Sequence, residues 1–315
     1  MPHKKNKVRR QASRNFQRNQ KRIQFLDLDG SFIQDSPIFY ESPEFRLIRK
    51  NKAVIDFIQG FWKWNEEALC VMSNYSHPNI SMQEMLVNKL SPYLGEVLVD
   101  LGCGAGNFYG RLFPLSPMSK KTVKKIFAVD IDWESLSLVP HNLKKFGWQG
   151  RVALIQSSTL SELPVWDNTA DAIVSSIGGL TYSGWRFDQQ GQLICEGRQA
   201  LISTLTDCNR ILKSGGYLGF SSLRPKPNFE MVLWDSLSWP VLNFKWKSFW
   251  EILLNGFHIK NISQFLHKAE REQHAQYLSI EEWTEYLEKT GFEVIDVTIG
   301  ECYAGQGVTI IARKI

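Results

Sequence analysis

The spacing of apolar residues along the chain changes near residue 95. Before it, apolar side chains recur at helical spacing over residues 44–69, and a second helix is predicted to start at Ser81, because Ser81 and Glu84 fit a capping box. After it, seven short apolar runs follow, the first five separated by helical stretches: residues 97–99, 126–129, 152–155, 172–174, 217–220, 292–299 and 308–312. This alternation predicts an α/β fold with a seven-stranded, mostly parallel, doubly wound sheet.

Two segments do not belong to this alternation. Residues 25–94 are predicted to form a helical N-terminal cap ahead of a main domain at 95–315. Residues 229–268 form an insert in that domain that is dense in aromatic side chains: Phe229, Trp234, Trp239, Phe244, Trp246, Phe249, Trp250, Phe257 and Phe265. The insert is interpreted as a lid over the active site, an apolar or aromatic acceptor pocket, or an interfacial membrane contact. Lys245 and Lys247 suit either of the last two.

The positive charge is confined to the N-terminus. The chain has a formal net charge of +5, and its first 22 residues hold nine Lys or Arg side chains and no acid. The remaining residues carry 28 basic and 32 acidic side chains, a net charge of −4. Residues 1–24 are therefore predicted to be a disordered basic tail. Its charge is either simply solvated or attracts the phosphates of nucleic acid or of an anionic membrane.

Composition and cysteine usage indicate a protein of a reducing compartment. Apolar residues make up 43% of the chain, no run is long enough for a transmembrane helix, and no signal peptide is expected. The five cysteines are scattered without a C-x-x-C pair, and the histidines show no metal-binding spacing, so neither a disulfide framework nor a metal site is expected. The expected location is cytoplasmic, with a peripheral position at a membrane surface as the variant.

A glycine-rich turn follows the first predicted strand. It runs from Asp100 to Gly106 (DLGCGAG), and its glycines are spaced G-x-G-x-G, whereas the dinucleotide fingerprint is G-x-G-x-x-G. Glycines let backbone N–H groups approach a ligand closely. Asp100 would repel a pyrophosphate but suits an amino group, and Asp130, at the end of the second strand, suits the hydroxyls of a ribose. Ligands with both ends include S-adenosylmethionine.

These features resemble the core of the class I S-adenosylmethionine-dependent methyltransferases, of the small-molecule type. The resemblance is carried, in chain order, by residues 97–106, 128–132, 163–174, 210–216 and 278–294, and together it reaches over roughly two thirds of the chain. Each motif alone is loose, and the ordered set is specific. The resemblance implies a Rossmann-like methyltransferase fold and S-adenosyl-L-methionine as the cofactor.

The resemblance also implies which residues bind the cofactor. Gly102, Gly104 and Gly106 would line its methionine part, Asp100 would hold its amino group, and Asp130 would bind its ribose.

Other contacts are implied by position in the same motifs. Ile131 would pack on the adenine face, while Cys103 in the loop and Ser176 after the fourth strand complete the predicted set. After the third strand the family usually has an Asp that binds the adenine amino group. This chain has Gln-Ser-Ser-Thr there, so Ser158 or Thr159 is expected to substitute through a hydroxyl or a backbone N–H.

The reacting methyl group is already activated in such a cofactor, so the enzyme supplies proximity and alignment, and a general base only when the nucleophile must lose a proton. The acceptor is expected after the fourth strand and under the cap. Tyr182 is the candidate catalytic residue, to orient or deprotonate the acceptor, with simple packing as the alternative. His258, His267 and His274 are either bases or surface and structural residues.

The sequence thus predicts an enzyme that methylates a small, apolar or aromatic acceptor, such as a quinone, a polyketide or a lipid-linked molecule. A nucleic-acid methyltransferase tethered by the basic tail is the alternative, against which stand the acidic body and the absence of a [DNS]-P-P-[YF] motif after the fourth strand. A non-catalytic S-adenosylmethionine-binding protein is a third hypothesis. A nicotinamide oxidoreductase fits the fold but not the glycine spacing. The sequence leaves the oligomeric state open.

Overall fold

A single mixed sheet organises the molecule. The computed structural model describes residues 38–48, 50–52, 54, 56 and 66–315. The strands lie in the order β1 (Ile38–Glu41), β4 (Arg151–Gln156), β3 (Lys125–Asp130), β2 (Val97–Leu101), β5 (Ala170–Ser176), β8 (Leu212–Leu223), β10 (Gly307–Lys314) and β9 (Phe292–Ile299). The first six run parallel, and β10 is antiparallel to both neighbours. A separate hairpin joins β6 (Trp185–Phe187) and β7 (Leu193–Glu196).

All seven predicted strands are present, and the sheet has one strand more than the sequence predicted. The extra strand is β1, which pairs in parallel with β4 so that Ile38 lies opposite Ala153. Its four residues are too few to show a periodicity, and its pairing partner lies more than 100 residues further along the chain.

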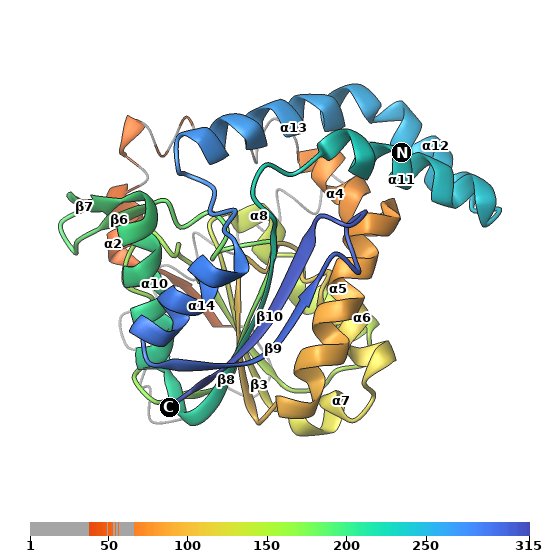
Figure 1. The fold of residues 1–315 in the computed structure, drawn as a ribbon. Coiled ribbons are helices and arrows are strands. Elements are labelled where there is room, and N and C mark those ends of the chain that lie inside the picture. Colours follow the sequence, from red (N-terminus) through yellow and green to blue (C-terminus); the bar gives the residue numbers. More distant parts are fainter. Residues whose placement is uncertain (1–37, 49, 53, 55, 57–65) are drawn as a thin grey trace.

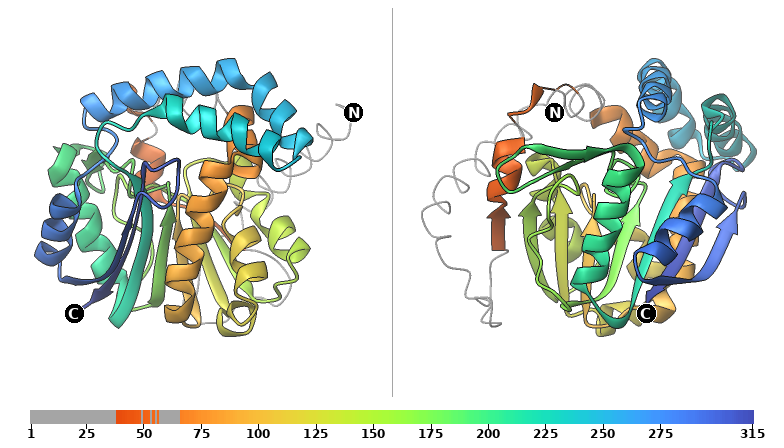
Figure 2. Two further views of the ribbon diagram at one scale, coloured as in Figure 1. Left: turned by 45° about the vertical axis from the view of Figure 1, so that its right-hand side comes forward. Right: turned by 60° about the vertical axis from the view of Figure 1, so that its left-hand side comes forward.

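Helices cover both faces of the sheet because successive residues of each strand point to opposite sides. Leu98 packs on one face with α5 (His77–Leu90), α6 (Tyr109–Leu115) and α9 (Val139–Lys145). Val99 packs on the other face with α10 (Gly197–Ile211) and α14 (Ile280–Lys289). Figures 1 and 2 show the sheet between these two helical layers. Three short helices fill the connections: α7 (Ser119–Thr122), α8 (Trp133–Leu136) and the 3-10 turn Ser91–Tyr93.

The strand order reverses at β2, which has β3 on one side and β5 on the other. The chain therefore leaves the carboxyl ends of β2 and β5 in opposite directions and opens a crevice between them. This is the edge of the sheet at which the glycine loop lies.

One helix begins earlier than predicted. Helix α5 starts at His77 with Ser76 as its N-cap residue and Pro78 in its first turn. Ser81 lies inside the helix, where its hydroxyl donates to the carbonyl of Pro78 at 2.9 Å, so the predicted capping box of Ser81 and Glu84 is wrong. Proline is favoured in a first helical turn because the N–H it lacks would have no partner there.

A third layer covers the carboxyl edge of the sheet. It consists of α4 (Glu66–Tyr75), the start of α5, and the insert helices α11 (Phe229–Leu242), α12 (Trp246–Leu254) and α13 (Gly256–Arg271), which share one apolar cluster. In Figure 1, α13 crosses the top of the molecule and α12 projects at its side. Of the continuous helix predicted over 44–69, the structure shows α2 (Pro43–Ile48) and the start of α4, and a turn at Lys50 and a bend at Asn51 interrupt it, so the prediction of one continuous helix is wrong. Residues 57–65 and the tail 1–24 lie outside the described residues. Among the described helices, none is long and apolar enough to cross a membrane.

Candidate functional site

Two positions of the loop after β2 require glycine, for different structural reasons. Both have positive φ, +73° at Gly102 and +53° at Gly104. A Cβ on Gly102 would lie 2.5 Å from the backbone nitrogen of Gly179, so this glycine lets the loops after β2 and β5 touch. A Cβ on Gly104 would meet nothing within 4 Å. Gly104 therefore presents bare backbone to open space, as a ligand-binding loop requires.

Asp130 fastens this loop from the end of β3. One carboxylate oxygen accepts from the backbone N–H of Gly104 at 2.7 Å, and the other accepts from that of Asp132 at 2.8 Å. Burial raises the pKa of Asp130 to about 6, although these two hydrogen bonds lower it. The next residue, Ile131, is half-buried, and its carbonyl accepts from the Gln156 amide at 3.2 Å.

Asp100 is the buried carboxylate of the site. It lies in β2 with 1% of its surface exposed, and its Oδ2 has no hydrogen-bond partner among the described residues. Burial raises its pKa to about 7, the nearby Asp130 adds to the rise, and the Tyr109 hydroxyl opposes it. An unpartnered carboxylate costs free energy in this position unless a donor reaches it. A ligand ammonium at the loop would supply that donor.

Three hydroxyls of the predicted set have different surroundings. The Thr159 hydroxyl donates to the carbonyl of Gly179 at 2.8 Å, and the Ser158 hydroxyl accepts from the N–H of Leu160 at 3.2 Å. Both therefore shape the loop after β4. The Ser176 hydroxyl, at the end of β5, has no partner among the described residues and lines the cavity described next.

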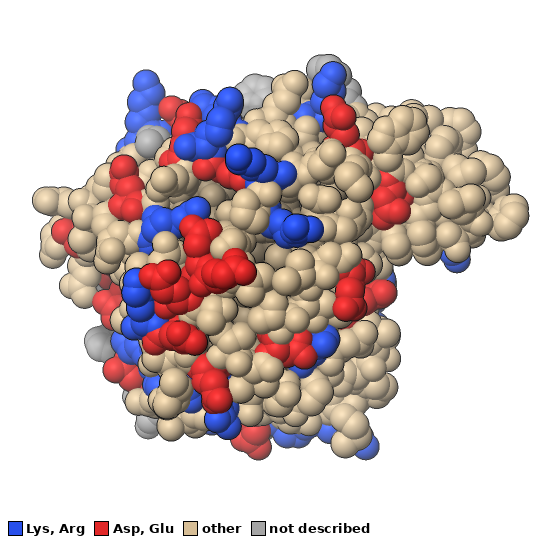
Figure 3. Space-filling model, viewed as in Figure 1, with Lys and Arg blue, Asp and Glu red and all other residues tan. Residues whose placement is uncertain are grey.

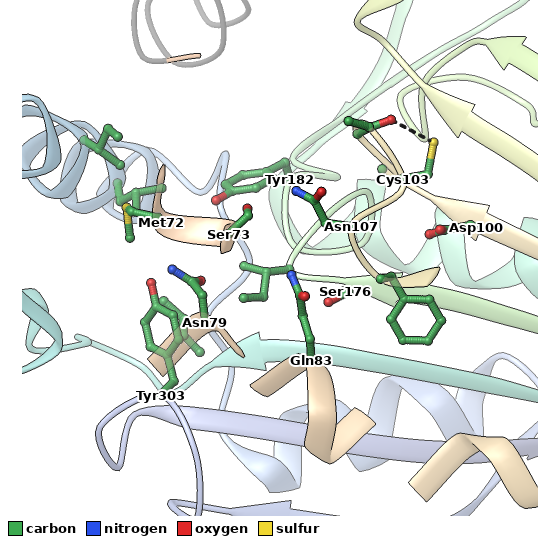
Figure 4. Close-up of a pocket in the computed structure, with 18 of the residues that line it drawn as sticks. Met72, Ser73, Asn79, Gln83, Asp100, Cys103, Asn107, Ser176, Tyr182 and Tyr303 are labelled. Carbon is green, nitrogen blue, oxygen red and sulfur yellow. Dashed lines mark hydrogen bonds between the residues drawn. The ribbon is translucent and has the colours of Figure 1, made fainter. Parts of the chain in front are cut away.

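A cavity extends from the glycine loop into the third layer. Asp100, Gly102, Cys103, Gly104, Ser176 and Tyr182 line it, whereas Gly106, Asp130, Ile131, Ser158 and Thr159 are not part of its lining. In the view of Figure 4, Asp100 and Cys103 lie at one end and Met72 and Tyr303 at the other. The thiol of Cys103 contacts the carbonyl of Gly104 at 3.4 Å, and burial raises its pKa, which keeps it neutral.

The far end of the cavity is built by residues that the sequence did not single out. Apolar side chains come from α4, β8 and α13: Met72, Leu223, Ile262 and Leu266. Polar side chains come from α5 and two loops: Asn79, Gln83, Tyr277 and Tyr303. The amide nitrogen of Asn79 and the amide oxygen of Gln83 have no hydrogen-bond partner among the described residues.

Tyr182 lies between the two ends of the cavity (Figure 4). Burial raises its pKa well above the usual range, the neighbouring Tyr303 adds to the rise, and the Tyr277 hydroxyl opposes it. The phenol therefore stays protonated at any physiological pH. It can donate a hydrogen bond, but it cannot act as a phenolate base.

The cavity is nearly free of charge. Among its described lining residues, Asp100 has the one carboxylate, and none is Lys, Arg or His. Within the described part of the chain, no group of three or more His, Cys, Asp and Glu side chains is placed to hold a metal ion. The three histidines predicted as possible bases are not part of its lining: His274 packs against Trp185, His267 packs against Phe229, and His258 is exposed on α13.

The switch-point crevice, its glycine loop and the two flanking carboxylates define a Rossmann-like protein with a site for an aminoacyl nucleoside. A family model described as a methyltransferase domain matches residues 94–291. The chain therefore belongs to the class I S-adenosylmethionine-dependent methyltransferases, as the motifs implied. The cofactor of this family is S-adenosyl-L-methionine.

Relatives are similar over parts of their length. A Pyrobaculum calidifontis protein named "Probable cobalt-precorrin-6B C(15)-methyltransferase (decarboxylating)" is 34% identical over 89 residues, which are 27% of this chain and 44% of that protein. This chain thus matches less than half the length of that relative. A SAM-dependent methyltransferase from Aquifex aeolicus is similar at 17% identity and a TM-score of 0.42, over 74% of this chain and 89% of its own. A SAM-dependent methyltransferase from Methanosarcina mazei is similar at 17% identity and a TM-score of 0.44, over 72% of this chain and 97% of its own.

Proposed function

We propose that this protein transfers the methyl group of S-adenosylmethionine to a small, uncharged acceptor with an apolar or aromatic body. The observation that supports this most is the continuous cavity, which joins the buried carboxylate and glycine loop to a nearly uncharged end. The carboxylate end fits the donor, and the neutral end fits the acceptor.

The donor end fits the cofactor on its own chemistry. The unpartnered Oδ2 of Asp100 would bind the cofactor ammonium, and the open backbone at Gly104 would lie along its methionine part. Asp130 has lone pairs left on both oxygens for the ribose hydroxyls, next to Ile131 for the adenine face. When bound, the cofactor supplies an activated methyl group for in-line displacement. We keep Cys103, Gly106, Ser158, Thr159 and Ser176 as proposed contacts of the same group.

The acceptor end selects by shape and hydrogen bonding. Asn79 offers an unpartnered donor and Gln83 an unpartnered acceptor, so a ligand with matching polar groups would satisfy both. Tyr182 would donate to the acceptor and orient it. A phosphate or carboxylate would lack a cationic partner among the described lining residues. Apart from Asp100, which we propose to bind the donor ammonium, the described lining offers no carboxylate, His or Lys as a general base. We therefore propose an acceptor that reacts without first giving a proton to the protein.

Calorimetry on the full chain tests the donor end. We expect S-adenosylmethionine and S-adenosylhomocysteine to bind, and Asp130→Ala to weaken both at least about tenfold, the equivalent of about 1.4 kcal/mol. Asp188→Ala is the matched control, because that carboxylate only caps the turn of the β6–β7 hairpin. Binding that is absent in the wild type, or equal in both variants, would sink the donor assignment.

A labelled methyl donor tests the acceptor end. We expect label to enter organic-soluble small molecules when the enzyme is incubated with a cell extract, and Leu266→Ala to slow this without changing donor affinity. Binding of the donor with no transfer to any fraction would identify a non-catalytic binding protein instead.

A nucleic-acid acceptor is the second candidate, favoured by the nine basic residues among the first 22. Label in the RNA fraction, lost on deleting residues 1–22, would establish that candidate and exclude the small acceptor.

A further inference from the structure

The helical hairpin of α11 and α12 carries an exposed apolar surface. Nine apolar side chains on it are each at least 38% exposed: Met231, Trp234, Val241, Leu242, Phe244, Trp246, Trp250, Leu253 and Leu254. We call these nine residues the hairpin surface. Trp234 is 72% exposed and Phe244, in the turn between the helices, is 80% exposed. Exposed apolar clusters of this size on a water-soluble protein mark a contact with another body.

The residues of the hairpin surface gather on one face of each helix. On α11 the exposed members recur at positions 231, 234, 241 and 242, and on α12 at 246, 250, 253 and 254, which is the spacing of one helix face. The opposite face of α11 is also apolar, and it packs inward through Phe229, Val232 and Pro240. Helix α11 thus presents apolar side chains on two opposite faces, and each of these faces needs an apolar neighbour.

The inward side of the hairpin is firmly attached to the body. The ring of Trp239 stacks on that of His77 with 4.4 Å between centroids, and His77 also pairs with Asp235 at 3.1 Å. Lys247 lies over the ring of Tyr75 in α4 at 5.4 Å. The hairpin surface therefore keeps its direction, because these contacts fix the rotation of both helices.

We propose that the hairpin surface docks on a lipid bilayer, with its Trp and Phe side chains in the headgroup boundary. In Figure 3 the hairpin projects from the body as an almost uncharged surface, and a convex projection can enter a bilayer but would need a matching hollow on a protein partner. Tryptophan is the side chain that bilayer interfaces favour most, and Lys245 beside Trp246 can extend to the headgroups. The nine basic residues of the first 22 add charge complementarity to anionic lipid.

Docking in this way would bring the acceptor end of the cavity next to the bilayer. Helix α13 packs on both hairpin helices, and the same helix lines the cavity with Ile262 and Leu266. An acceptor dissolved in the membrane would then reach the site over an apolar path. This consequence rests on the proposed function, whereas the docking itself does not.

Co-sedimentation of the full chain with vesicles tests the docking. The variant is Trp234→Ser with Phe244→Ser, and the control is Leu115→Ser with Met118→Ser, which removes two exposed apolar side chains beside α7 at the opposite end of the molecule (Figure 1). We expect the wild type to bind phosphatidylcholine vesicles at high salt. We expect the variant to bind at least about tenfold more weakly and the control to bind within about twofold of the wild type.

Three results would overturn the proposal. The wild type does not bind neutral vesicles, or the variant and the control bind alike, or light scattering shows a dimer that only the variant converts to a monomer. The last result would mean that a second copy covers the hairpin surface. Thermal unfolding of each variant excludes a general loss of structure. Calorimetry with S-adenosylhomocysteine on the same samples separates this outcome from the proposed function, because donor binding requires no hairpin.

Discussion

Replacing Asp100 by Asn removes a buried charge that the free protein must tolerate. Burial raises the pKa of Asp100 from 3.8 to about 7 in the folded state. A shift of this size corresponds to roughly 4 kcal/mol between the two protonation states. A raised pKa means that the group's contribution to stability is fully present below about pH 4 and is lost as pH rises through about 7. The ligand-free wild type should therefore lose stability over this window.

The measurement is denaturant unfolding of the ligand-free protein at several pH values. Asp130, whose pKa is also raised by burial, to about 6, contributes a slope of the same sign, so the wild type is compared with the variant. We expect the stability of Asp100→Asn relative to the wild type to rise between pH 5 and pH 8 by up to about 2.7 kcal/mol, because two pH units of the window, from 5 to about 7, lie in this range. Parallel curves for the two proteins would refute a buried, raised carboxyl at this position.

The affinity for the methyl donor should rise over the pH range in which the ligand-free protein loses stability. In the proposed donor site the cofactor ammonium binds the ionised form of Asp100, so affinity for S-adenosylhomocysteine should rise as pH increases through about 7, with release of a proton on binding below that pH. Calorimetry in two buffers of different ionisation enthalpy measures the proton. In Asp100→Asn the affinity should fall at least about tenfold and the proton should disappear. Equal proton release in both proteins would assign the titration to another group.

Three further outcomes follow from the site. Gly102→Ala should lower the free energy of unfolding by about 3 kcal/mol, because its Cβ would lie 2.5 Å from a backbone nitrogen. Gly104→Ala should lower it by only about 1 kcal/mol, yet donor binding measured by calorimetry should be lost. Tyr182→Phe should lower kcat/KM for the acceptor about tenfold at unchanged donor affinity, and the wild-type pH profile should show no ionisation of Tyr182. Arg186→Met should destabilise the protein by about 2 kcal/mol, because the carbonyls of Thr159 and Ser161 lose this donor. Asp207 loses its pair with Arg186 but keeps its pair with Arg210 at 2.6 Å, and an unchanged denaturant melt would contradict the prediction.

The donor half of the fold was predictable because its signals are local. A buried strand, a glycine turn and an acid at the next strand end lie within about 30 residues of Asp100, and each has a steric or electrostatic reason that a sequence displays. The roles assigned to these residues stay predictions. The start of α5 is marked by Ser76 and Pro78, whereas the pattern of Ser81 and Glu84 resembles a capping box but lies inside the helix.

The acceptor half was not predictable from local patterns. Asn79 belongs to α5, between β1 and β2 in the chain, and Tyr303 belongs to a loop near the C-terminus, where it has a positive φ of 53° without being a glycine. Only the tertiary fold brings them together. The pair of Arg186 and Asp207 was also not predictable from local patterns, since charged side chains are expected at the surface and both of these are buried.

The insert helices leave and rejoin the body at two points held by main-chain atoms. The N–H of Arg224 donates to the carbonyl of Gln306 at 2.9 Å, and that of Gln276 donates to the carbonyl of Thr181 at 2.7 Å. Such bonds do not depend on which side chains lie between them. One continuous stretch can thus be exchanged during evolution, or grafted in a chimaera, to give a new acceptor repertoire on an inherited donor half.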